Sequence, residues 1–294
     1  MHGTTESSNP LHANLDLYSA HDLVDALIED HGIAVAAVRA SSARLAQAVQ
    51  AAVPRLAGGG RLLYVGAGTS GRIGLQDAVE LYPTFSWPPE RAIALLAGGV
   101  RAVTESVEGA EDDAAQGAAD ILGVAPTRQD VVLAIAASGR TPYVLGAITA
   151  ARGAGALTIG LANNRDSAVA AAAEIGILLD TGSEIICGST RLKAGTAQKI
   201  ALNSFSSAVM VGLHKVYGNL MVDMRASNGK LRERAVQLTM DATACTEARV
   251  RQVLDACEHH VKTAIVCIKA DLEPAAAQAL LERCDGSIRR AVGD

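Results

Sequence analysis

Two short segments rich in glycine and hydroxyl side chains are the first candidates for chemistry. The earlier one reads GAGTSGR from Gly66 onward and follows an apolar run. The first N–H groups of a helix lack partners within the helix and carry its partial positive charge, so a helix beginning here would attract an anion. Thr69 and Ser70 add two hydroxyl donors. We expect Gly68, Thr69 and Ser70 to bind a phosphoryl group.

The same segment also fits two other uses. It matches the GxGxxG pattern of dinucleotide-binding loops, which normally need an acidic residue at the end of the next strand to hold the ribose. The next predicted strand runs into Leu96-Ala97-Gly98-Gly99 without an acid. That difference favours a single phosphate over a dinucleotide. A plain tight turn is the remaining alternative, because one glycine-rich loop is weak evidence.

A second segment of the same kind follows the apolar run 131–136. It reads ASGRTPY from Ala137, with Pro142 in the first helical turn, where proline is accepted. Two such loops at the carboxyl ends of strands in one parallel sheet can converge on one crevice, the usual ligand site of such sheets. The predicted contacts from this loop are Ser138, Gly139, Arg140 and Thr141.

Three further polar residues, and Arg140 of the second loop, are candidates with open alternatives. Ser189 and Thr190 precede a long apolar helical pattern. They can cap that helix and turn its N-terminus toward a ligand, or they can be caps only. Arg140 and Lys193 can neutralise a phosphate or a carboxylate, and each fits a surface cation equally well.

The cysteine and histidine patterns argue against metal chemistry. Five cysteines are scattered without a CxxC motif, and seven histidines occur without HExxH. His259 and His260 are adjacent on a predicted helix, where neighbours do not share a face. We expect surface histidines and no metal site. An odd number of scattered cysteines also argues against a disulfide framework and favours a reducing compartment.

A parallel sheet is needed to carry the two loops. Five short apolar runs bounded by Gly, Asp or Asn predict buried strands at 62–65, 92–96, 131–136, 157–161 and 175–179. Helical-length segments separate most of them, and the missing polar alternation is typical of strands covered on both faces. We therefore expect the α/β class, as a three-layer α/β/α sandwich with a mainly parallel five-stranded sheet.

Helical patterns precede and follow this predicted sheet. Two helices are expected between Ser19 and Leu56, and a long apolar helix from Thr190 to about Tyr217. Helical patterns continue from Asn228 without a strand signal, which predicts a small helical appendage. The expected division is an N-terminal arm with helices at 1–54, a ligand-binding sheet domain at 55–218 and a C-terminal helical domain at 219–294.

Bulk composition excludes several classes of protein. A chain of 294 residues that is 49% hydrophobic can bury a sizeable core. A net charge of -5 and a pI near 5.8 argue against a nucleic-acid partner held by a basic surface. No stretch approaches the roughly 20 apolar residues of a membrane span, and the first ten residues do not resemble a secretory signal. We expect a cytoplasmic protein that binds neither nucleic acid nor membrane.

Longer motifs carry a resemblance to a known family. The two loops are similar to those of sugar isomerase (SIS) domains, which hold phosphorylated sugars. The runs GSTRLKAGTAQK from Gly188 and YGNLMVD from Tyr217, with shorter matches such as Thr5-Glu6, resemble the N-acetylmuramic acid 6-phosphate etherase family nearly end to end. The resemblance implies a SIS-like fold and removal of D-lactate from N-acetylmuramate 6-phosphate, without metal or organic cofactor. The product would be N-acetylglucosamine 6-phosphate, in amino-sugar and cell-wall recycling. With the small-residue helix, the resemblance also suggests a homodimer.

The resemblance implies that two glutamates are catalytic. Glu80, in the run DAVE, would be the acid and base of elimination, and Glu111, in EGAE, would serve the addition of water. From the residues alone, Glu105, Glu108 and Glu111 at three-residue spacing also fit a solvated acidic helix face. Glu80 also fits a surface position near a helix end.

The position of Glu80 leaves a geometric alternative open. A helix beginning at Ser70 places Glu80 about 15 Å along its axis, farther than a 6-phosphate lies from C2 of its own sugar. Either the chain bends, or Glu80 serves a site formed with another subunit. Two other functions fit the same loops: a phosphosugar aldose-ketose isomerase and a non-catalytic phosphosugar-binding regulator. Both glutamates together favour an enzyme, and the absence of a basic helix-turn-helix motif disfavours a transcriptional regulator.

Overall fold

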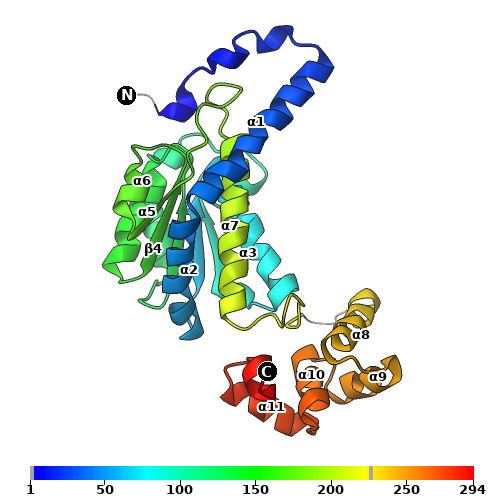
Figure 1. The fold of residues 1–294 in the computed structure, drawn as a ribbon. Coiled ribbons are helices and arrows are strands. Elements are labelled where there is room, and N and C mark those ends of the chain that lie inside the picture. Colours follow the sequence, from blue (N-terminus) through cyan, green and yellow to red (C-terminus); the bar gives the residue numbers. More distant parts are fainter. Residues whose placement is uncertain (1–2, 225–227) are drawn as a thin grey trace. The chain divides into compact units, whose positions relative to one another are not determined.

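The computed structural model describes residues 3–224 and 228–294, and its centre is a five-stranded sheet (Figure 1). Every strand pair is parallel, and the strand order is β2-β1-β3-β4-β5. The strands are β1 (Leu62–Gly66), β2 (Ala92–Leu96), β3 (Val131–Ile135), β4 (Leu157–Ala162) and β5 (Ile175–Leu178). The predicted α/β class with a parallel five-stranded sheet is confirmed.

Helices cover both faces of the sheet. Figure 1 shows α5 and α6 on one face and α2, α3 and α7 on the other. Strands β1, β3 and β4 are buried along their whole length, which explains why their sequences are apolar without alternation. The helices of this part are α1 (Ala20–Ala40), α2 (Ser42–Ala57), α3 (Gly68–Phe85), α4 (Ala114–Gly123), α5 (Pro142–Gly153), α6 (Ala168–Ala172) and α7 (Lys193–Gly212).

Short 3-10 helices form much of the remaining connections. They are η1 (Thr4–Glu6), η2 (Pro10–His12), η3 (Leu15–Leu17), η4 (Pro89–Arg91), η5 (Gly99–Val103) and η6 (Ala110–Asp112). The first three precede α1, and the last two lie between β2 and α4. The segment η5–η6 therefore follows the carboxyl end of an edge strand.

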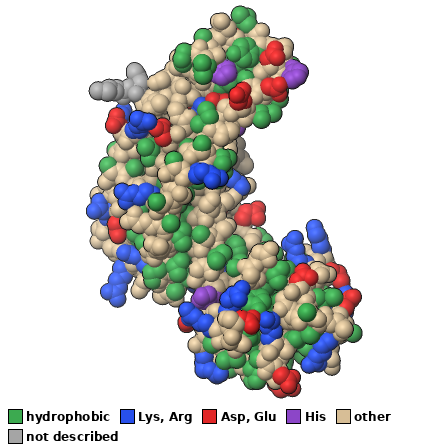
Figure 2. Space-filling view, in the orientation of Figure 1, with side chains coloured by type: hydrophobic (Ala, Val, Ile, Leu, Met, Phe, Trp, Pro, Cys, Tyr) green, Lys and Arg blue, Asp and Glu red, His purple; other side chains and the backbone are tan. Residues whose placement is uncertain are grey.

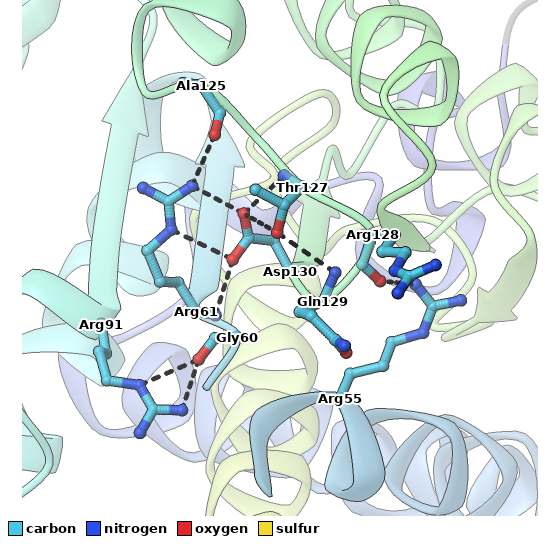
Figure 3. A network of polar contacts seen from close by, with 9 residues as sticks. All are labelled: Arg55, Gly60, Arg61, Arg91, Ala125, Thr127, Arg128, Gln129 and Asp130. Atoms are coloured by element: carbon cyan, nitrogen blue, oxygen red, sulfur yellow. Dashed lines mark hydrogen bonds and ion pairs between the residues drawn. The ribbon is translucent and has the colours of Figure 1, made fainter. Parts of the chain in front are cut away.

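An ion pair joins the amino ends of the neighbouring strands β1 and β3 (Figure 3). Arg61, just before β1, contacts Asp130, just before β3, with 2.7 Å between Nη2 and Oδ2. The main-chain N–H groups of Arg61 and Thr127 also donate to the Asp130 carboxylate, each at 2.8 Å. Burial alone would raise the pKa of Asp130, but these bonds and the Arg61 charge hold that pKa below its ordinary value. Both carboxylate oxygens of Asp130 thus accept hydrogen bonds within this junction.

Two more arginines fasten the same end of the sheet to α2. Arg55 of α2 donates to the carbonyl oxygens of Arg128 and Gly155, and Figure 3 shows the first of these bonds. Arg91 donates to the carbonyl oxygen of Gly60, which lies just before β1, through Nε at 3.0 Å and Nη2 at 2.6 Å. The amino ends of the strands are thus held by charged side chains bound to main-chain oxygens.

The C-terminal part is a set of five helices with its own core. Residues 261–267 of α10 are all buried, and apolar side chains of the neighbouring helices pack around them. The helices are α8 (Gly229–Thr243), α9 (Glu247–Ala256), α10 (Val261–Ala270), α11 (Pro274–Arg283) and α12 (Ile288–Val292). Asp223 in the preceding segment lies 2.7 Å from Lys215 and 3.0 Å from the buried Lys262.

The chain forms two compact units by its internal contacts. One comprises residues 1–79 and 90–206, so α1 and α2 belong with the sheet; the other comprises residues 80–89 and 207–294. The division at residues 54 and 218 that we expect from the sequence remains a prediction. Within the described ranges, no helix combines the length and apolar character that a membrane crossing requires.

Candidate active site

The two predicted loops leave the sheet side by side. Strand β1 pairs with β2 on one side and with β3 on the other, so the strand order reverses between β1 and β3. Open parallel sheets bind ligands at such a switch point, outside the carboxyl ends of the strands. Gly66 and Ile135 are partners in the register, which places the starts of the two loops about 5 Å apart.

The first loop is a tight turn that two glycines allow. A Cβ on Gly66 would lie 2.7 Å from the nitrogen of Gly71, and a Cβ on Gly71 would lie 2.8 Å from the oxygen of Gly66. Helix α3 begins immediately, at Gly68, whose φ of 51° is the left-handed conformation. The helix start, with Thr69 and Ser70, therefore sits directly on the end of β1, where an anion can approach its first N–H groups.

A small cavity opens beside this helix start. Its volume is about 160 Å³, and its lining includes Gly68, Arg72 and Glu111. Arg72 holds one wall, because Nε donates to the oxygen of Ala102 at 2.9 Å and Nη2 to the oxygen of Glu105 at 2.7 Å. Pockets for whole small molecules measure roughly 300–1,000 Å³. This cavity can therefore hold only part of a sugar phosphate.

Glu111 reaches the cavity from η6 and is exposed. Gly109 begins this turn with a φ of 73°, and Asp113 follows it as the cap of α4, accepting from the nitrogen of Gln116 at 2.8 Å. Residues 104–109 connect two 3-10 helices rather than forming a helix of their own. The acidic helix face that the three-residue spacing also allowed is therefore absent from this segment.

The second loop is held by its main chain on both sides of Ser138. The oxygen of Ala137 accepts from Asn163 N at 3.1 Å and from Asn164 Nδ2 at 2.9 Å. The oxygen of Gly139 accepts from Val169 N at 2.9 Å. The half-buried Ser138 lies between these anchors, and its Oγ accepts from the nitrogen of Arg140 at 3.2 Å.

The other residues of the second loop lie in one turn around Ser138. Thr141 is buried and its Oγ1 lies 3.4 Å from Ser138 Oγ. Gly139 has a φ of 70°, and a Cβ there would lie 2.4 Å from Ser167 Oγ, so this position requires glycine. Arg140 is exposed at the tip. The loop thus presents hydroxyl groups and one cation at the start of α5.

The start of α7 lies beside the first loop. A Cβ on Gly195 would lie 3.3 Å from Thr69 Cγ2, so the missing side chain lets α7 approach α3 closely. The half-buried Ser189 and Thr190 come just before this helix. The structure therefore places these two predicted contacts in the segment that leads into α7, within the same compact unit as both loops.

The cap of α7 is Glu184, which sequence reasoning did not identify. Its carboxylate accepts from the nitrogens of Lys193 at 3.2 Å and Ala194 at 2.9 Å. Burial raises the pKa of Glu184, although these two N–H groups act in the opposite direction. The capping role considered for Ser189 and Thr190 thus falls to the buried Glu184, so two N–H groups at the start of α7 already have an acceptor within the chain.

Lys193 is buried in an ion pair. Its Nζ lies 2.6 Å from Asp30 Oδ1 of α1, and the two side chains are 2% and 4% exposed. The adjacent His31 contacts Thr196 Oγ1 through Nδ1 at 2.8 Å. These contacts tie α1 to the first turn of α7. A direct contact between Lys193 and a ligand would require the ion pair to open.

Glu80 and Asp77 occupy the same helix one turn apart and differ sharply. Asp77 is buried and accepts from Tyr64 Oη at 2.8 Å, Asn203 Nδ2 at 2.6 Å and Ser206 Oγ at 3.1 Å. Glu80 is exposed. Helix α3 runs without interruption from Gly68 to Phe85, so Glu80 lies about 18 Å along it from Gly68.

The histidines and acidic residues do not form a metal centre in residues 3–224 and 228–294. No group of three or more His, Cys, Asp or Glu side chains in this part could hold a metal ion. His259 Nδ1 lies 3.8 Å from Asp255 Oδ1, and His260 Nδ1 lies 2.5 Å from Thr263 Oγ1. The two histidines thus turn to different neighbours.

The fold and the two loops are those of a SIS domain. A family model described as a SIS domain matches residues 120–208, and one described as the glucokinase regulatory protein N-terminal SIS domain matches residues 44–152. A solved phosphoheptose isomerase from Francisella tularensis superposes with a TM-score of 0.51 at 20% identity, covering 66% of this chain and 100% of that chain. That likeness shows the fold alone.

Relatives of similar length narrow the class. An N-acetylmuramic acid 6-phosphate etherase from Deinococcus radiodurans is 54% identical over 99% of this chain and 95% of its own length. One from Streptomyces coelicolor is 46% identical over 98% of this chain and 93% of its own. The chain belongs to the N-acetylmuramic acid 6-phosphate etherase family.

Proposed function

We propose that this chain cleaves the lactyl ether of N-acetylmuramic acid 6-phosphate, giving N-acetylglucosamine 6-phosphate and D-lactate. One observation carries the proposal: Glu111 lines a cavity together with Gly68, which begins α3. The N–H groups at the start of α3 and a carboxylate thus lie together at the carboxyl end of β1. Family membership supports the same substrate.

The proposed reaction requires positioned carboxyl groups. The open-chain sugar has an aldehyde at C1, which makes the hydrogen on C2 acidic. A base removes that proton, the C3–O bond to lactate breaks with protonation of the leaving oxygen, and water then adds to C3. We assign the elimination to Glu80 and the addition of water to Glu111. The aldehyde itself accepts the electron pair, so the proposed route needs no metal or organic cofactor.

The phosphate would anchor the sugar at the two loops. Charge-assisted hydrogen bonds from hydroxyl and main-chain N–H groups suit phosphoryl oxygens, and two helix starts add their positive ends. The proposed contacts are Gly68, Thr69, Ser70, Ser138, Gly139, Arg140, Thr141, Ser189 and Thr190. Lys193 would join them only in a state in which its pair with Asp30 is open.

A second copy of the chain would complete the site. Glu80 lies far along α3 from the loop of its own chain, and exposed apolar side chains of Val79 and Tyr82 flank it. The arm around α1 also exposes large apolar side chains, and Figure 2 shows hydrophobic groups on its visible face. These are Leu11, Leu17, Val24, Ile28, Ile33 and Val35. Burial in a homodimer would remove them from water.

We assign the reaction to the cytoplasm and to the recycling of amino sugars from the cell wall. All five cysteines are free thiols, which suits a reducing compartment. The small, mostly polar site and the acidic charge give no basis for a nucleic-acid partner.

Release of D-lactate from N-acetylmuramic acid 6-phosphate tests the proposal. Purified protein should release lactate without added metal, and in water labelled with heavy oxygen the label should appear on C3 of the sugar. An aldose-ketose isomerase or a regulator would release none. Absence of lactate where a relative from this family is active would refute the assignment, and release without label on C3 would refute elimination followed by hydration.

A further inference from the structure

The segment before the first long helix packs against the candidate site. Thr5, in η1, is completely buried although it lies near the start of the chain. Gly3 approaches Asn164 so closely that a Cβ would lie 2.7 Å from Asn164 Oδ1. The partners of this segment lie in the stretches of chain that follow the carboxyl ends of β4 and β5. It therefore lies at the functional end of the sheet.

Thr5 is bound to the second loop through Asn164. The nitrogen of Thr5 donates to Asn164 Oδ1 at 3.1 Å, and Asn164 Nδ2 donates to Thr5 Oγ1 at 2.9 Å. The same Nδ2 donates to the oxygen of Ala137 at 2.9 Å. Asn164 is 3% exposed, so its amide is fixed on both sides. Ala137 immediately precedes Ser138. Thr5 therefore orients the Asn164 amide, and this amide in turn holds the main chain next to Ser138.

Thr5 is also bound to the segment that leads into α7. Its main-chain oxygen accepts from the nitrogen of Gly188 at 3.1 Å. Cys187 Sγ donates to the oxygen of Glu6 at 3.1 Å, and Glu6 Oε2 lies 3.0 Å from where a Cβ on Gly188 would be. Ser189 and Thr190 follow directly. Thr5 thus connects the Ser138 loop, through Asn164, with the segment that contains Ser189 and Thr190.

We propose that Thr5, acting through Asn164, is a positioning residue that sets the spacing between the Ser138 loop and the Ser189–Thr190 segment. This inference rests on the proposed function, because it assumes that both segments hold one phosphosugar. Thr5 uses its nitrogen, hydroxyl and carbonyl groups to join the two segments. Small displacements of binding groups cost much of their benefit, so loosening this bridge weakens binding even when the fold persists.

Substitution of Thr5 gives a direct test with a matched control. Thr5→Val keeps the shape and removes the hydroxyl, Thr5→Ser keeps the hydroxyl, and Thr4→Val changes the exposed neighbour in the same turn. We expect Thr5→Val to raise the dissociation constant for N-acetylglucosamine 6-phosphate about tenfold, as loss of one buried hydrogen bond predicts. Thr5→Ser should restore most of the affinity, and Thr4→Val should match the parent protein.

Hydrogen exchange separates positioning from a general loss of stability. In Thr5→Val, amide exchange should rise in residues 137–141 and 188–192 and stay unchanged in β1 and β3. With substrate, KM should rise more than kcat falls. Equal affinity and exchange in Thr5→Val and Thr4→Val, or a lower melting temperature with unchanged affinity, would overturn the inference.

A second variant covers the case in which Thr5→Val does not fold. Asn164→Asp keeps the side-chain shape and removes the donor to Ala137 and Thr5, and the same local exchange and weaker binding are expected. Unchanged affinity there would also overturn the inference. The binding and exchange measurements need no turnover. Failure of the parent protein to release lactate would therefore count against the proposed function and leave this test intact.

Discussion

The two ends of the parallel sheet use polar groups in opposite ways. At the amino ends of β1 and β3, Arg61 and Asp130 satisfy each other in a partly buried pair. At the carboxyl ends, the bonds that hold the second loop go mainly to the oxygens of Ala137 and Gly139, and hydroxyl groups lie between these anchors. At the amino ends, charged side chains fix the main chain. At the carboxyl ends, hydrogen bonds to main-chain oxygens fix a loop whose hydroxyl groups are then positioned for a ligand.

This difference predicts a separation of effects. Changes at the amino ends should lower stability and leave the chemistry of the folded protein intact, because every strong contact there is internal. Changes at the carboxyl ends should remove binding or turnover with little effect on stability. Stabilisation and function thus occupy opposite ends of the same strands, as loops carried on a rigid scaffold commonly do.

The largest expected effect is at Glu80. Glu80→Gln should lower kcat by about 10³-fold, because the neutral amide cannot remove or deliver the proton, as losses of general acid–base groups show. Affinity for the product, measured by calorimetry, should remain. Glu90→Gln, at another exposed acidic position, is the control. Parent-like turnover in Glu80→Gln would remove this residue from the mechanism.

Mixed dimers show whether Glu80 acts in the partner subunit. At a substrate concentration well below KM, Glu80→Gln and Ser138→Ala are each impaired, but a mixed dimer has one intact site if loop and glutamate come from different chains. Random mixing of equal amounts should then restore about a quarter of the parent activity, as two-fold symmetry requires. No gain over the separate variants would mean that Glu80 and the loop of one chain act together.

Glu111→Gln should produce a smaller loss of turnover. We expect about a 10²-fold decrease in the formation of N-acetylglucosamine 6-phosphate, because the addition of water loses its base. Asp112→Asn changes the next carboxylate in the same turn and, since Asp112 does not line the cavity, should leave activity unchanged. Equal activity in Glu111→Gln and Asp112→Asn would mean that Glu111 is a solvated surface residue without a catalytic role.

Asp130→Asn tests the opposite end of the sheet. The free energy of unfolding should fall by about 2–4 kcal/mol, because Arg61 loses its charged partner in a largely buried junction. Below the melting transition, KM and kcat should match those of the parent. Denaturant titration and steady-state kinetics measure the two effects. A selective loss of kcat with full stability would contradict the division between the two ends.

The same pair predicts how acid affects stability. The folded state holds the pKa of Asp130 below its ordinary value, so this stabilisation is complete above the ordinary pKa. It is lost as the pH falls through the folded-state pKa, below about pH 4. Asp130→Asn should lack this part of the acid dependence. Parallel pH profiles for the two proteins would show that Asp130 contributes none of it.

Ser138→Ala is expected to have the smallest effect. Loss of one hydrogen bond to a charged acceptor should cost about 1.5–3 kcal/mol of phosphosugar binding. The melting temperature should change little, because Ala137 and Gly139 hold the loop without the hydroxyl. Calorimetry with N-acetylglucosamine 6-phosphate gives the affinity. An unchanged dissociation constant would mean that the second loop does not contact the phosphate.

Local patterns predicted most of the fold. The five strands are short and apolar because both faces of the sheet are covered, and the structure confirms this class. The helical starts after Gly66 and Ala137 could also be predicted, since glycine, hydroxyl residues and proline have positional meaning at such turns. Adjacency of the two loops then follows from the order in which the strands pair.

Contacts between distant residues could not be predicted in the same way. Lys193 resembles a surface cation in the sequence because its partner, Asp30, is 163 positions away. The bridge between Thr5 and Asn164 spans 159 positions, and no local pattern indicates it. Asp77 and Glu80 are both acids on one helix, and only tertiary packing shows that the first is bound by three donors.

A crystal structure with N-acetylglucosamine 6-phosphate bound is the most direct test of whether both loops and both glutamates serve one site. We expect the phosphoryl group to lie within hydrogen-bond distance of the hydroxyl groups of Ser70 and Ser138 in one chain. A Glu111 carboxylate and a Glu80 carboxylate, from either subunit, should face the sugar. A phosphoryl group bound away from both loops, or a sugar remote from both glutamates in every subunit, would contradict it.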